Sequence, residues 1–169
     1  MERILVSACL LGAKVRYHGG DARLPHPTLQ RWQEEGRLVM ACPEVDGGLG
    51  TPRPPAEIAG CDAGRGVLAR VAFVRTAAGA DVTNQFLAGA SMALDAARRN
   101  GVRVAILKDG SPSCGSSLVY DGTFSSARTA GVGVTAALLE QNGIRVFSET
   151  EIDAAEKWLI DVSASENTT

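Results

Sequence analysis

Short apolar runs alternate with longer amphipathic segments along this chain of 169 residues. Residues 4–8, 38–41 and 102–107 are runs with the length and side-chain branching of buried strands. Residues 83–99 carry apolar side chains at helical spacing and end with arginines before Gly101, which predicts a helix. Strands that alternate with helices favour right-handed crossovers and a mostly parallel sheet. The pattern therefore predicts an α/β fold, with a Rossmann-like sheet, helices on both faces and an active site at the carboxyl ends of the strands.

Other elements are marked by local signals. The pattern predicts a short helix from Pro27 to Gly36, a strand over 67–75, a hairpin or irregular excursion over 118–128, a helix over 135–141 and a strand over 144–147. Ser148 and Glu151 form a capping box that opens a final helix towards Ile160. Residues 43–55 are rich in proline and glycine, which predicts a long loop without regular structure.

Length and charge limit what this chain can be. It is long enough for one domain with a sizeable core, expected over 1–162, followed by a polar, disordered tail over 163–169. Its 17 basic and 19 acidic residues give a net charge of -2, which argues against nucleic acid as a partner. The first residues are too few and too charged for a signal peptide, and no apolar run has the length of a membrane span. We therefore expect a cytoplasmic protein with reduced thiols, either a monomer or a homodimer.

Three of the four cysteines stand where an apolar run ends. Cys9 and Cys42 directly follow their runs, and Cys114 lies in a loop of serine, proline and glycine after the third. If these strands are parallel neighbours, the three sulfurs meet at one edge of the sheet, where open α/β proteins bind ligands. Frequent burial of cysteine is the alternative explanation, but it does not account for the repeated placement at strand ends. Cys61 follows no comparable apolar run.

Three converging thiols are compatible with three chemistries. A zinc site usually draws on paired C-x-x-C spacing, which this chain lacks. A reactive thiol needs a resolving cysteine or an activating histidine, and His18 and His26 have no evident partner. A 4Fe-4S cluster normally takes four thiolates, so three would leave one iron open to act as a Lewis acid. The dispersed ligands favour the cluster.

Polar residues beside these cysteines are candidates for catalysis. Glu44 lies two residues after Cys42, where a carboxylate can transfer protons at a bound substrate; alternatively it is a solvated acid or pairs with Arg53. Ser111 either orients a substrate or fixes the turn before Pro112. Arg16 and Arg53 are candidates for contact with a polar substrate, although arginines are common in surface loops.

The order of motifs resembles that of the thiouracil desulfidase family over nearly the whole chain through Glu151. The motifs are Ser-Ala-Cys-Leu-Leu-Gly at 7–12, Arg-Tyr at 16–17, Cys-Pro-Glu at 42–44, Gly-Gly-Leu at 47–49, Thr-Pro-Arg-Pro-Pro-Ala-Glu at 51–57, Asp-Val-Thr at 81–83, Leu-Lys at 107–108, Ser-Pro-Ser-Cys-Gly at 111–115, Tyr-Asp-Gly-Thr-Phe at 120–124 and Gly-Val-Thr-Ala-Ala-Leu-Leu at 133–139.

This resemblance implies an enzyme that converts 2-thiouracil, or a related free thiopyrimidine, to uracil and hydrogen sulfide. It also implies a 4Fe-4S cluster on Cys9, Cys42 and Cys114, with Glu44 as acid and base and Ser111 assisting at the substrate. The chain departs from the family where members often carry Cys instead of Val15 and Asp instead of His18. Another open-iron enzyme, such as a dehydratase, and a non-catalytic iron or sulfur carrier are the alternatives.

Overall fold

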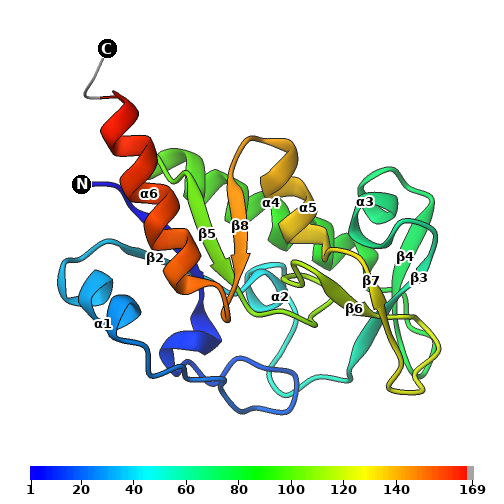
Figure 1. Cartoon of the computed structure of the whole chain (residues 1–169). Coiled ribbons are helices and arrows are strands. Elements are labelled where there is room, and N and C mark those ends of the chain that lie inside the picture. Colours follow the sequence, from blue (N-terminus) through cyan, green and yellow to red (C-terminus); the bar gives the residue numbers. More distant parts are fainter. Residues whose placement is uncertain (167–169) are drawn as a thin grey trace.

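The computed structural model describes residues 1–166, and a fully parallel four-stranded sheet lies at its centre (Figure 1). Its strands follow the order β2 (Leu38–Ala41), β1 (Ile4–Ser7), β5 (Val104–Leu107) and β8 (Arg145–Ser148). Ile4 pairs with Leu38 on one side and with Val104 on the other. The three apolar runs that end at cysteines are therefore adjacent parallel strands, as predicted.

Helices cover both faces of this sheet, because successive side chains of a buried strand point to opposite faces. On one face, Ile4 and Val6 pack with α1 (Pro27–Glu34) and α6 (Ile152–Glu166). On the other face, Leu5 packs with α4 (Thr83–Arg99) and α5 (Val134–Gln141). The α/β fold predicted from the sequence is confirmed, and none of the helices in residues 1–166 is long and apolar enough to cross a membrane.

Two antiparallel hairpins extend from the central sheet. One consists of β3 (Ala56–Gly60) and β4 (Ala72–Thr76), with α3 (Ala63–Leu68) between them. The other consists of β6 (Leu118–Tyr120) and β7 (Arg128–Ala130), which confirms the hairpin predicted near 118–128. A third group of buried side chains, including Ile58, Val74 and Phe86, packs the first hairpin against α4.

The predicted strand over 67–75 was wrong in its first half. Residues 63–68 form α3, and the chain turns at Arg70, whose φ is 65°, before β4 begins at Ala72. The sequence pattern did not predict this helix, because Gly64 and Gly66 lower the helix propensity of the segment. Glycine is required at position 66, because a Cβ there would lie 1.8 Å from the carbonyl oxygen of Cys61.

The segment 43–55 was also misjudged, since it begins with the short helix α2 (Pro43–Asp46). Proline fits there because the first helical turn needs no N–H donor. Cys61 directly follows strand β3, which carries no apolar run comparable to the other three and belongs to the separate hairpin.

Half of the predicted capping box forms before the final helix, since the Ser148 hydroxyl accepts from the amide of Thr150 and not from that of Glu151, and the helix is longer than expected. The amide of Ser148 donates to Oε2 of Glu151 at 2.8 Å, and α6 then continues through Glu166. Residues 163–166 are thus helical and do not belong to a disordered tail, while 167–169 lie outside the described residues. The domain boundary at 162 stays a prediction.

Candidate active site

The three strand-end cysteines line one cavity of about 380 Å³. Cys9 lies in the 3-10 turn η1 (Ala8–Leu11) that follows β1, and Cys42 stands between β2 and α2. Cys114 lies in the loop that follows β5. The geometry of neighbouring parallel strands therefore brings together three thiols that are far apart in the sequence; their role as cluster ligands stays a prediction.

Burial keeps these thiols protonated in the absence of a bound cation. It raises the pKa of Cys9 to about 11 and the pKa of Cys114 to about 12. Burial also raises the pKa of the half-buried Cys42. Arg16 and Lys108 act in the opposite direction on Cys9, without reversing the shift. A soft metal centre must therefore displace these protons when it binds, since the thiolate is the ligand.

The raised pKa values predict slow thiol reactivity at neutral pH. In the cluster-free protein, a pKa of about 11 leaves only about 1 in 1,000 Cys9 thiols ionised at pH 8. We expect the rate at which an aromatic disulfide reagent modifies Cys9 and Cys114 to rise steeply between pH 8 and pH 11. Peptide mass spectrometry measures the modification of each thiol. The exposed Cys61 serves as the internal reference. Equal rates for Cys9, Cys114 and Cys61 at pH 8 would contradict this prediction.

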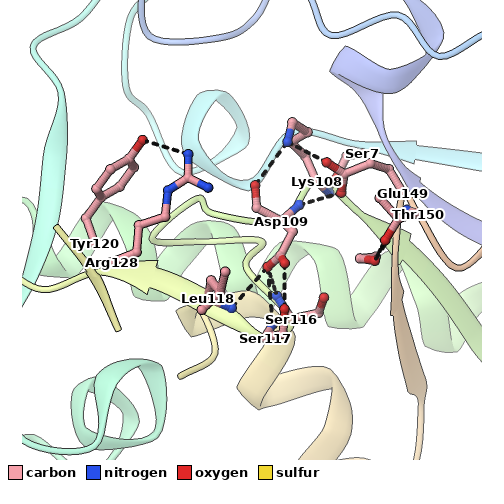
Figure 2. A network of polar contacts seen from close by, with 11 residues as sticks. Ser7, Lys108, Asp109, Ser116, Ser117, Leu118, Tyr120, Arg128, Glu149 and Thr150 are labelled. Carbon is pink, nitrogen blue, oxygen red and sulfur yellow. Dashed lines mark hydrogen bonds and ion pairs between the residues drawn. The ribbon is translucent and has the colours of Figure 1, made fainter. Parts of the chain in front are cut away.

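Asp109 shapes the loop that carries Cys114 (Figure 2). Its Oδ1 accepts hydrogen bonds from the amides of Ser116 at 2.8 Å, Ser117 at 3.2 Å and Leu118 at 3.3 Å. Its Oδ2 accepts one from the Ser117 hydroxyl at 2.6 Å. Burial of Asp109 acts to raise its pKa, but these hydrogen bonds outweigh it and lower the pKa to about 2. The carboxylate is thus a fixed anchor of the loop across the physiological pH range.

The start of this loop is fastened to two strands of the sheet. The Ser7 hydroxyl at the end of β1 accepts a hydrogen bond from the Lys108 amide at 3.0 Å. Glu149, just after β8, accepts one from the Asp109 amide at 2.7 Å and forms an ion pair with Lys108. These contacts fix the origin of the loop relative to the strand that leads to Cys9.

Glu44 lines the cavity and pairs with Arg53, which confirms the pairing considered from the sequence; its role as acid and base stays a prediction. Its Oε1 lies 3.3 Å from Nε of Arg53, and both side chains are mostly buried. Arg53 is held in turn by the carbonyl oxygens of Val15 at 2.9 Å and Gly50 at 3.1 Å. The ion pair holds the carboxylate in one orientation instead of leaving it in solvent.

A chain of hydroxyls connects Glu44 with Ser111. The fully buried Ser113 hydroxyl donates to Oε2 of Glu44 at 3.1 Å. The Ser111 hydroxyl lies 2.9 Å from that of Ser113, and its oxygen accepts hydrogen bonds from the amides of Ser113 and Cys114, each at 3.1 Å. Ser111 therefore fixes the turn and lines the cavity at once. Ser113 was not predicted to contact Glu44, because the two are 69 residues apart.

Close backbone packing sets the position of α2, and with it Cys42 and Glu44. A Cβ at Gly89 of α4 would lie 1.7 Å from the carbonyl oxygen of Pro43. Alanine there forces the two helices apart.

We expect Gly89→Ala to lower the free energy of unfolding by about 1–3 kcal/mol, the usual range for overpacking. Without the contact, Gly→Ala inside a helix would raise the free energy of unfolding by up to about 1 kcal/mol. The sign of the change therefore shows whether the contact is present. Thermal denaturation measures it, with Ser91→Ala at an exposed position of the same helix as the control. A higher melting temperature for Gly89→Ala would contradict the tight contact.

The remaining candidates divide between the cavity and the surface. Arg16 and Val15 line the cavity, whereas His18, His26 and Cys61 do not. Nδ1 of His18 accepts from the amide of Gly20, and Nδ1 of His26 accepts from that of Thr28. The side chain of His18 therefore supports a local turn, that of His26 caps the N-terminus of α1, and neither lines the cavity.

The donor set fits an iron-sulfur cluster. In residues 1–166, no three His, Cys, Asp or Glu side chains are grouped closely enough to hold a metal ion. A 4Fe-4S cube presents a separate iron to each thiolate, so its ligands surround a volume instead of one point. Three thiols that line one cavity, with arginine and lysine side chains beside them, meet that requirement.

Comparison with known proteins identifies the family of this chain. The model of the 2-thiouracil desulfurase family matches residues 4–151. The uncharacterised protein YbbK of Bacillus subtilis (strain 168) is 47% identical over 150 residues, which span 89% of this chain and 97% of YbbK. A solved structure of the [4Fe-4S]-dependent thiouracil desulfidase TudS (DUF523Vcz) superposes with a TM-score of 0.86 at 45% identity, covering 94% of this chain and 98% of that one. The chain therefore belongs to the 2-thiouracil desulfurase family.

Proposed function

We propose that this protein removes sulfur from 2-thiouracil or a related free thiopyrimidine, and that Cys9, Cys42 and Cys114 hold a 4Fe-4S cluster. The observation that supports this most is the convergence of these three thiols and Glu44 on one cavity, in a chain similar to a [4Fe-4S]-dependent desulfidase. With three protein ligands, the bound cluster supplies an open iron, a soft Lewis acid suited to a thiocarbonyl sulfur. Four cysteines that are all unpaired are compatible with the reducing cytoplasm that such a cluster needs.

The overall reaction requires water and proton transfers but no electrons. A C=S bond and one water become a C=O bond and hydrogen sulfide, so both hydrogens of the water finish on sulfur. Glu44 is the group that moves them, one at a time: its carboxylate takes a proton first from the attacking water and then from the hydroxyl formed on carbon, and it returns each to the departing sulfur. The Arg53 ion pair and the Ser113 hydrogen bond hold the two carboxylate oxygens in place during this transfer.

The size and lining of the cavity favour a small substrate. A cavity of about 380 Å³ lies within the range of small-molecule sites, about 300–1,000 Å³. Arg16, Arg53, Lys108 and Arg128 also line it, and they suit the polar edges of a pyrimidine. A thiolated tRNA would need several phosphate contacts, and a chain with a net charge of -2 has no general field to provide them.

A product assay tests this proposal. We expect anaerobically reconstituted protein to release uracil and hydrogen sulfide in equal amounts from 2-thiouracil, without an added electron donor and with little dependence on ionic strength. Sulfide binding without turnover would identify a carrier, and dehydration of a hydroxy acid instead would identify another open-iron enzyme. Faster desulfuration of thiolated tRNA, with a rate that collapses as salt rises, would overturn the small-molecule substrate.

A further inference from the structure

The Tyr-Asp-Gly-Thr-Phe motif at 120–124 has no role in the mechanism above, yet it borders the same cavity. Tyr120, at the end of β6, and Phe124, in the loop before β7, both line it. Ser126 and Arg128 from the same hairpin do so as well. One wall of the cavity is therefore built from this hairpin.

The loop holds Phe124 in an unusual conformation. Its φ of 56° lies in the left-handed region, which bulky residues rarely adopt and which recurs at ligand sites. Oε1 of Glu57, a buried carboxylate on β3, accepts hydrogen bonds from the amides of Gly122 at 3.1 Å and Phe124 at 3.2 Å. A Cβ at Gly122 would lie 2.5 Å from the carbonyl oxygen of Ile58, so the loop packs directly on β3. These contacts maintain the strained backbone.

The other two aromatic rings at the cavity already have partners. The guanidinium of Arg128 lies 5.3 Å from the ring centroid of Tyr120 and donates to its hydroxyl at 3.4 Å, a pair that Figure 2 also shows. The ring of Tyr17 lies edge-on to that of His18, with centroids 4.9 Å apart. Within residues 1–166, Phe124 has no such ring or cation contact, and 36% of it is exposed. A flat apolar face is therefore available at the cavity.

We infer that Phe124 is the stacking residue for the planar substrate ring, and that Glu57 is a positioning residue that holds Phe124 against the cavity. This inference rests on the proposed function and deepens it by assigning the contact that selects a flat aromatic heterocycle. Stacking on an aromatic ring binds any pyrimidine, whether it carries sulfur or oxygen. Phe124 should thus contribute to the affinity for the substrate and for uracil alike, and little to the chemical step.

The test uses cluster-loaded protein and two readouts, the kinetics with 2-thiouracil and the Kd for uracil. We expect Phe124→Ala and Phe124→Leu to raise both KM and Kd by on the order of 10-fold, with kcat changed by less than about 3-fold and iron content unaltered. Phe124→Tyr should restore both values. Phe73→Ala removes an exposed ring of β4 that does not line the cavity, and it serves as the matched control.

The role of Glu57 is tested by a double-mutant cycle. We expect Glu57→Gln to raise KM in the wild-type background but to add little to Phe124→Ala, because Glu57 acts through that ring. The inference would be overturned by an unchanged KM in Phe124→Ala, or by an equal effect of Glu57→Gln in both backgrounds. In either case, turnover by the wild-type protein would leave the proposed function standing. A wild-type protein that neither desulfurates 2-thiouracil nor binds uracil would overturn both.

Discussion

Replacing Cys9, Cys42 or Cys114 with serine is expected to remove most of the bound iron and to abolish measurable desulfuration. Anaerobic reconstitution of the wild-type protein should give about four irons per chain, since the three thiolates hold one 4Fe-4S cluster. Each serine removes a soft ligand that a hydroxyl does not replace. Colorimetric iron and sulfide analysis, together with the visible absorption of the cluster, measures the effect.

Cys61→Ser provides the matched control for this experiment. Cys61 is exposed on the turn after β3 and does not line the cavity, so its replacement should leave iron content and activity close to wild type. If Cys61 proved as necessary as the other three, the cluster would have four protein ligands, and no iron would be left open for the substrate.

Glu44→Gln is expected to keep the cluster and the fold but to lower kcat by about 100-fold or more, the usual contribution of a general acid and base. The amide has nearly the shape of the carboxylate and lines the cavity in the same way, but it cannot exchange protons. Single-turnover kinetics with 2-thiouracil measures the loss, and iron analysis of the same sample shows whether the cluster is present.

Ser111→Ala is the companion variant for Glu44→Gln. Ser111 lies one hydroxyl away from Glu44, through Ser113, so its loss should lower kcat by less than the loss of Glu44 does. Loss of iron in Glu44→Gln would instead make Glu44 a ligand or a structural support of the cluster.

The convergence of the thiols was predictable from the sequence because it follows from a regular pattern. Runs of apolar residues mark β1, β2 and β5, although β2 at the edge of the sheet is only partly buried, and adjacent parallel strands must end at the same edge of a sheet. Cys9, Cys42 and Cys114 therefore had to lie near one another once these strands were identified. The family resemblance found in the motifs is confirmed by the match over residues 4–151.

The parts that sequence reasoning missed depend on contacts between distant segments. The apolar pattern continues from α3 across the turn at Arg70 into β4, so periodicity alone does not separate the two elements. The short helix α2 packs on Gly89 of α4, far along the chain. Likewise, Glu57 binds the loop of Phe124 across 67 residues, and no local spacing signals such a bond.

The most direct test of the account is an anaerobic ultraviolet spectrum of 2-thiouracil mixed with cluster-loaded protein. The thione absorption band should disappear and the uracil band should grow over repeated turnovers, while cluster-free protein and cluster-loaded Glu44→Gln leave the thione band nearly unchanged. A thione band that persists with the loaded wild-type protein, or that disappears equally fast with iron-free protein, would contradict cluster-dependent desulfuration at this cavity.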